Sequence, residues 1–175
     1  VSESEIDFNF YLVYENFIMK KIKIVHAKGE IARKEHAKIT LFSLNVMQTH
    51  QAYAIKVIEK NFNGVFVGSS QVSALNIMKS MSKFTNDEIS RFGMLHVTSE
   101  DDFEFAHRTF AEFFYAQYLI ESLNNFQNLN EEEKFFVLDF LKINLIDVKI
   151  LREVFGVINQ FIMGYSEVNA EQTLW

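Results

Sequence analysis

Apolar residues recur at helical spacing through most of the chain. From Phe10 to Val25 this spacing predicts a helix over about residues 6–26 that stops at Gly29. A second long helix is expected over residues 33–60. Its apolar stripe comprises Leu44, Met47, Ala54, Val57 and Ile58.

Shorter elements are expected in the middle of the chain. Residues 65–67 resemble a very short strand, and residues 72–81 carry apolar positions at three-residue spacing, which indicates a helix. Thr85 with Glu88 three residues later forms the pattern of a capping box. We therefore expect a further short helix there, ended by Gly93.

A change of pattern follows Gly93. Residues 94–97 and 103–105 flank a polar turn, and the second segment alternates apolar and acidic residues, which predicts a β-hairpin. A helix is then expected over residues 108–125. Its predicted buried side comprises Phe110, Phe113, Phe114, Ala116, Ile120 and Leu123.

The C-terminal part also has helical signals. Asn130 followed by three glutamates is typical of a helix start, because acids stabilise the positive end of the helix dipole. An amphipathic stripe predicts a last helix over residues 147–163, and we expect a frayed tail over 164–175. The order of elements predicts a mainly α fold. It has a winged-helix-like domain over 1–125 with one small β-hairpin, and the start of a second packed helical domain over 126–175.

Composition narrows the function classes. The 175 residues include no cysteine, which excludes a disulfide scaffold, a thiolate zinc site and a cysteine nucleophile. The absence of proline agrees with long helices. No apolar run is long enough for a membrane span, and no Asn-x-Ser/Thr sequon occurs, so we expect a cytoplasmic protein. The chain begins at Val1 rather than Met, which suggests a fragment or a processed product.

Charge is distributed unevenly. The net charge of −6 does not favour general nucleic-acid binding. Residues 16–40 nevertheless hold seven lysines and arginines against two glutamates, a local charge of +5. Residues 84–112 hold seven acids against two arginines, a local charge of −5. An acidic wing would be repelled by a duplex, so for the basic segment we favour a solvated face, or one that meets an acidic partner, over DNA binding.

One motif carries a family resemblance. The sequence of residues 103–120 resembles the end of the winged-helix domain in NLR-like NACHT (STAND) ATPases, where a Phe-x-His strand end runs into a Thr-Phe-x-Glu-Phe-Phe-x-Ala helix. The segments 11–21 and 51–54 are similar to the first and second helices of the same domain. The matching positions are Phe105, His107, Thr109, Phe110, Glu112, Phe113, Phe114 and Ala116.

The resemblance implies a non-catalytic role. In this family the histidine contacts the terminal phosphate of bound ADP, so His107 is the implied nucleotide contact, which depends on an adjoining ATPase domain. The chain has no phosphate-binding loop of its own, so we expect no enzyme activity and no cofactor in this chain. The implied partner is a nucleotide-binding domain in cis or trans. The family resemblance places such a module in innate immune signalling.

Other readings of the same residues stay open. His107 can also cap the following helix or pair with Glu104 or Glu112. The remaining histidines lack the spacing of a metal site, so we expect structural or surface roles for His26, His36, His50 and His96. The alternative functions are a stand-alone protein–protein interaction module and, third, a DNA-binding winged helix.

Overall fold

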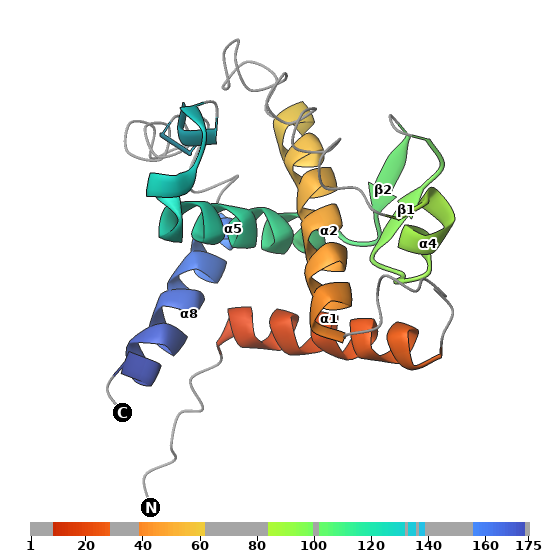
Figure 1. Ribbon diagram of the computed structural model, residues 1–175, viewed down its shortest axis with the longest axis horizontal. Helices are drawn as coiled ribbons and strands as arrows, with labels where there is room; N and C mark the ends of the chain where they lie inside the picture. The colour runs from red at the N-terminus through yellow and green to blue at the C-terminus, as the bar shows by residue number, and fades with distance from the viewer. Residues whose placement is uncertain are drawn as a thin grey trace, which may run out of the picture.

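The computed structural model describes residues 9–28, 39–61, 84–99, 102–131, 133–135, 137–138 and 156–173. Its elements are α1 (Phe10–Ala27), α2 (Ile39–Asn61), α4 (Asn86–Ser90), β1 (Leu95–Val97), β2 (Phe103–Phe105), α5 (Arg108–Asn124), the 3₁₀ turn η2 (Phe126–Asn128) and α8 (Gly156–Thr173). In Figure 1, α5 runs through the middle of the molecule, α2 crosses it, and α1 lies along one edge. The predicted mainly α fold with one small hairpin and additional packed helices is confirmed.

Helix α1 begins at a side-chain cap. The amide oxygen of Asn9 accepts a hydrogen bond from the backbone N–H of Leu12 at 3.1 Å, which satisfies a donor left free at the helix start. The helix buries one face against the rest of the protein, made up of Tyr11, Ile18, Ile22 and Val25. Phe17 is 44% exposed at the edge of this face, and its ring stacks on that of Phe110 with 5.8 Å between the centroids. The buried face agrees with the helical spacing of apolar residues predicted for this segment.

Helix α2 packs across α5, and most of the predicted stripe lies on its buried face: Ala54 and Ile58 are buried, and Met47 and Val57 are half-buried against the core. Phe42 and Val46 are fully covered, whereas Leu44, which we expected in the stripe, is 48% exposed. Five of the residues that α2 buries are polar, namely Ser43, Asn45, Thr49, His50 and Gln51. Hydrophobic periodicity does not count polar residues in a core, so the prediction missed the polar part of the buried face.

The capping box of α4 is confirmed. The backbone N–H of Thr85 donates to the Glu88 carboxylate at 2.8 Å, and the N–H of Glu88 donates back to the Thr85 hydroxyl at 3.4 Å. Gly93 then turns the chain into β1 with a φ of 67°, a left-handed conformation that costs glycine little. The short helix and its glycine end therefore agree with the prediction.

The predicted hairpin is also present. Strands β1 and β2 are antiparallel, with Leu95 opposite Phe105 and Val97 opposite Phe103 on the inner face. His96 and Glu104 face each other on the outer face, and both are exposed. The turn closes with a hydrogen bond from the Thr98 N–H to the Asp102 carbonyl at 2.9 Å. The alternation in the sequence thus reported correctly which side of the hairpin is buried.

Helix α5 is central. Every residue from Ala111 to Ile120 is buried, because α2, α8 and β2 all contact this helix. Two residues that were expected on the buried side are partly exposed. Phe110 is only half-buried, and Leu123 is 40% exposed since it lies in the last turn, beyond the crossing helices.

At residue 130 the expected cap is found, because the Asn130 amide oxygen accepts from the Glu133 N–H at 2.9 Å.

Helix α8 corrects the prediction of a frayed tail. The helix continues through Gly164 to Thr173, and it packs on α1 and α5. Gly164 does not end the helix. A side chain there would meet the Asn9 amide oxygen at 2.8 Å, so the glycine allows α1 and α8 to approach closely.

Some expected elements lie outside the described residues. They are the strand at 65–67, the helix at 72–81 and the first part of the helix predicted over 147–163. Within the part that the structure describes, no helix is both long and apolar enough to cross a lipid bilayer.

Candidate functional site

His107 lies between the hairpin and the central helix. It follows β2 by two residues and is the N-cap of α5, with extended backbone angles of −148° and 138°. The preceding Ala106 donates its N–H to the carbonyl of Met94 at 2.9 Å, which ties this junction to the start of the hairpin. The histidine therefore sits on a backbone fixed from both sides.

The cap uses one ring nitrogen of His107. The Nδ1 atom lies 3.2 Å from the backbone nitrogen of Thr109 and 2.7 Å from its hydroxyl oxygen. A backbone N–H can only donate, so Nδ1 acts as the acceptor and carries no proton in this arrangement. The proton of the neutral ring is then on Nε2, which becomes a hydrogen-bond donor.

The ring of His107 is exposed to solvent. Its Nε2 atom has no hydrogen-bond partner among the described residues. Of the alternatives open from the sequence, the cap is therefore observed. The structure shows no pairing with Glu104, which lies across the hairpin from His96, or with Glu112, which pairs with Arg108.

Arg108 and Glu112 form an ion pair one turn into α5. The guanidinium Nε lies 2.9 Å from the carboxylate Oε1, and the Glu112 side chain is 6% exposed against 59% for Arg108. Burial raises the pKa of Glu112, while the charges of Arg108 and, less strongly, of His107 oppose that rise. Arg108 thus adds a fixed positive charge beside His107 at the N-terminal end of α5, where the helix dipole also favours anions.

The aromatic residues of the motif form the base of the site. Phe113 and Phe114 are fully buried and meet edge to face at 5.7 Å between ring centroids. Phe105 at the end of β2 contacts Phe114, which joins the hairpin to the helix. These phenylalanines are core, as we expected. They hold His107 rigidly rather than offering rings to a ligand.

The second similar segment also has a packing role. Gln51, Ala52, Tyr53 and Ala54 are all buried. Gln51 donates from Nε2 to the Glu121 carboxylate of α5 at 3.2 Å. The segment is therefore part of the packing between α2 and α5, the helix that His107 caps.

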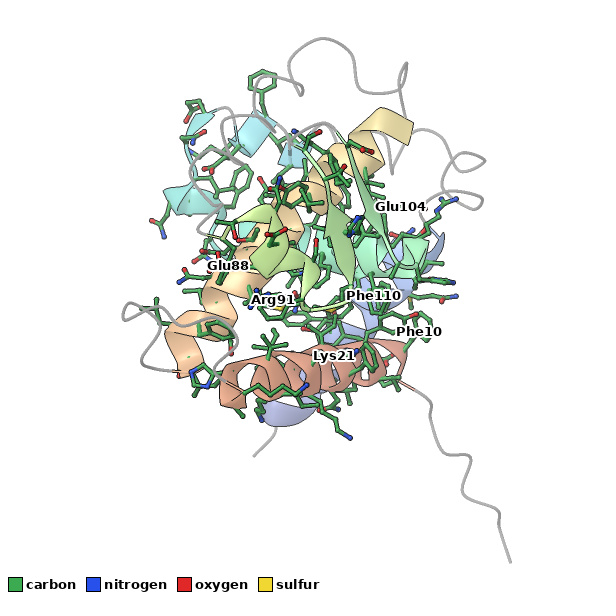
Figure 2. All side chains as sticks on the ribbon, turned by 90° about the vertical axis from the view of Figure 1, so that its right-hand side faces the viewer. Phe10, Lys21, Glu88, Arg91, Glu104 and Phe110 are labelled. Atoms are coloured by element: carbon green, nitrogen blue, oxygen red, sulfur yellow. The ribbon has the colours of Figure 1, made fainter. Side chains whose placement is uncertain are left out.

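Where the structure describes them, the charged residues of the basic and acidic segments lie on different elements. Lys20, Lys23 and Lys28 are exposed on α1, whereas Asp87 and Glu104 are exposed on α4 and the hairpin. In Figure 2, Glu104 lies far above Lys21 of α1, with Arg91 and Phe110 between them in height. The exposed acids of the hairpin argue against its entry into a DNA groove.

The sequence did not reveal every residue that matters. Arg108 was counted only as a charge, although its spacing of four residues from Glu112 predicts a helical ion pair. His50 was expected to be structural or at the surface, and it is completely buried. His26 contacts Phe42, His96 is exposed on β1, and His36 lies outside the described residues. Among the residues placed by the structure, no three potential ligands cluster around a metal position.

Comparisons with protein-family models, with curated proteins and with solved structures gave no match for this chain.

Proposed function

We propose that this chain is a non-catalytic regulatory module of an NLR-like STAND ATPase, acting in cytoplasmic innate immune signalling. It packs on a nucleotide-binding domain, in cis or in trans, and controls that domain's ADP/ATP switch and its assembly. His107 contacts the terminal phosphate of ADP in the closed state. The nucleotide belongs to the adjoining domain, because this sequence contains no phosphate-binding loop.

The observation that carries the proposal is that the two ring nitrogens of His107 have different roles. Nδ1 of His107 caps α5 through Thr109, while the exposed Nε2 remains available as a donor. Capping fixes both the ring orientation and the tautomer. A donor held in this way can bind a phosphate oxygen of a neighbouring domain without a further ordering cost.

The surroundings of His107 favour an anionic partner. Arg108 presents a mostly exposed guanidinium next to it, and Glu112 accepts a hydrogen bond from its Nε atom. A guanidinium has further N–H donors suited to phosphate oxygens. The buried residues of α5 give this pair of donors a rigid support.

The switch follows from the loss of that contact. A histidine that binds the terminal phosphate of ADP stabilises the closed arrangement by its differential affinity for that state. Exchange of the nucleotide removes the contact and releases the module as a rigid body. Release of this module then permits assembly.

The test uses a polypeptide that joins this chain to its nucleotide-binding domain. We expect His107→Asn to accelerate ADP release about tenfold, the effect of losing one hydrogen bond to a charged group. Asparagine keeps an acceptor for the cap but does not extend to the position of Nε2. The measurement is the dissociation rate of a fluorescent ADP analogue, with His96→Gln as an exposed histidine control. Unchanged ADP retention in His107→Asn would refute the phosphate contact.

A stand-alone interaction module is the second candidate. It is favoured by the exposed apolar residues on α1 and α2, since such groups often mark protein contacts. A natural transcript that encodes this chain without an ATPase domain, together with a stable complex recovered from cells, would support this alternative.

The DNA-binding alternative predicts duplex binding that weakens steeply with salt, and no binding at ~50 mM salt would exclude it.

A further inference from the structure

The turn of the β-hairpin carries two hydroxyl groups at the protein surface. Thr98 and Ser99 directly follow β1, and both residues are exposed. The hairpin lies at the edge of the molecule that is away from α8 (Figure 1). Because an exposed turn at an edge is open to another protein, both hydroxyls are within reach of an enzyme that modifies side chains.

The sequence after Ser99 is acidic. Glu100, Asp101 and Asp102 occupy the next three positions, and Glu104 follows on β2. No lysine or arginine occurs within seven residues of Ser99 on either side. Protein kinases select their substrates largely by the pattern of charge around the hydroxyl. A serine followed by three acids therefore suits a kinase with a basic substrate groove, and it does not suit one that reads basic residues.

Hydrogen bonds distinguish Ser99 from Thr98. The Thr98 hydroxyl donates to the Asp102 carbonyl at 2.7 Å and also to the Asp102 carboxylate, so its proton is used within the turn. The Ser99 Oγ atom instead accepts from the Asp102 N–H at 3.1 Å, and its proton has no acceptor among the described residues. Phosphoryl transfer requires the hydroxyl proton to pass to a base of the kinase. The Ser99 hydroxyl is therefore the better phosphate acceptor of the two.

Thr85 provides a comparison within the same chain. It is exposed, and acids follow it two and three positions later, at Asp87 and Glu88. The Glu88 carboxylate, however, accepts from the Thr85 N–H at 2.8 Å and from the Thr85 hydroxyl at 2.9 Å. The capping box thus occupies both the hydroxyl and the acid that a kinase would read. Asp102, three positions after Ser99, is exposed, and its carboxylate can accept several hydrogen bonds.

We propose that Ser99 is phosphorylated by an acidophilic protein serine/threonine kinase. The Ser99 Oγ atom attacks the γ-phosphorus of ATP held by the kinase, and a new oxygen–phosphorus bond forms. The bond between that phosphorus and the bridging oxygen breaks, and ADP leaves with its electron pair. The hydroxyl proton passes to the catalytic aspartate of the kinase.

The phosphate makes the hairpin turn strongly anionic. It carries a charge of about −1.5 to −2 at pH 7, which adds to the exposed carboxylates of Asp102 and Glu104. A partner with clustered arginines gains charge-assisted hydrogen bonds to the modified turn, whereas an acidic partner is repelled. Ser99 lies at the opposite end of β2 from His107. The inference is therefore independent of the proposed nucleotide contact, and either can fail without the other.

The experiment treats the folded chain with casein kinase II, an acidophilic kinase, and ATP. Tandem mass spectrometry should locate a phosphate on Ser99, and Ser99→Ala should abolish modification of this turn. Asp102→Asn should lower kcat/KM for Ser99 about tenfold, the effect of losing one hydrogen bond to a charged group. Asparagine keeps an oxygen that accepts from the Thr98 hydroxyl, so the turn is retained.

Three controls keep the outcome clear. Glu131→Gln removes an exposed acid outside the hairpin and should leave the rate at Ser99 unchanged. The cyclic-AMP-dependent protein kinase, which reads basic residues, should not modify Ser99. Circular dichroism verifies that each variant is folded.

Four results would overturn the proposal. The first is a folded chain that casein kinase II leaves unmodified at Ser99, and the second is a phosphate on Thr98 or Thr85 in its place. The third is an unchanged rate in Asp102→Asn, since the acid would then have no part in recognition. The fourth is modification of a synthetic peptide of residues 92–106 but not of the folded chain, because the fold would then hide the serine.

Discussion

The imidazole of His50 stacks on the ring of Phe114, with 4.9 Å between the ring centroids and 29° between the planes. This contact joins α2 to α5 at the centre of the protein, and His50 is completely buried. Its Nδ1 lies 2.8 Å from the Val46 carbonyl, so Nδ1 carries the proton. The other nitrogen, Nε2, is buried without a hydrogen-bond partner among the described residues. The ring is therefore held in its neutral form.

Stability is expected to fall in mild acid because of His50. Burial lowers the pKa of His50 from 6.5 to about 4, and the bond to Val46 only partly opposes this. Between these pH values the unfolded chain binds a proton that the folded chain does not, so unfolding becomes easier as the pH falls from 6.5 to about 4. The total loss is about 3 kcal/mol, and it does not grow further below the folded-state pKa. Urea unfolding across this range measures it.

The matching variants are His50→Leu and His96→Gln. Leucine has similar bulk and no titrating group, so His50→Leu should remove most of this acid-dependent loss. His96 is exposed on β1, and its replacement should leave the loss unchanged. An equally steep loss in His50→Leu would mean that other groups cause the acid sensitivity.

Because α1 and α8 pack closely at Gly164, substitution by alanine is expected to change the stability of the protein differently at Gly164 and at Gly156. Gly164→Ala would place a methyl group 2.8 Å from the Asn9 amide oxygen and 3.0 Å from the Tyr11 Cβ. We expect a loss of about 1–3 kcal/mol, the usual effect of overpacking. Gly156 has nothing within 4 Å of such a methyl group. Gly156→Ala should therefore be neutral or stabilise by up to about 1 kcal/mol, and thermal unfolding of both variants measures the difference.

The glycines also show what the sequence could and could not predict. At Gly93 the local pattern was sufficient, because a capping box lies just before it and a strand pattern just after it. Gly164 gave the same local signal of a helix end. Its real role depends on Asn9, which is 155 residues away in the sequence. Helix starts and the hairpin are local features and were predictable, whereas close helix approach is not.

Some features of the candidate site were likewise predictable from the sequence, and others were not. The position of His107 between a strand and a helix followed from the pattern, and its capping role was one of the stated alternatives. The exposure of His107 is set by the packing of the hairpin against α5, which the pattern does not describe. The burial of His50 and Gln51 was not predictable either, because polar residues in a core interrupt the apolar period on which helix faces are predicted.

Because of the capping box of α4, substitution of Thr85 is expected to lower the stability of the protein by a measurable amount. Thr85→Ala removes the hydroxyl that accepts from the Glu88 N–H, and we expect a loss of about 1 kcal/mol. Thr85→Ser keeps that acceptor and should stay within a few tenths of a kcal/mol of wild type. Equal destabilisation by both substitutions would show that the methyl group of Thr85, rather than its hydroxyl, stabilises this turn.

The ion pair between Arg108 and Glu112 predicts opposite effects for its two partners. Burial raises the pKa of Glu112, so the folded protein binds its proton more readily than the unfolded chain does. Glu112 therefore lowers stability as the pH rises from about 4.5 through the raised folded-state pKa.

Glu112→Gln should be neutral or mildly stabilising at pH 7, because it removes the cost of a buried charge. Arg108→Gln should destabilise by about 1 kcal/mol, since it leaves that charge without its partner; much of the arginine is exposed, which keeps the effect small. Urea unfolding at pH 7 compares the two, and the double variant should resemble Glu112→Gln. A greater loss in Glu112→Gln than in Arg108→Gln would contradict this account.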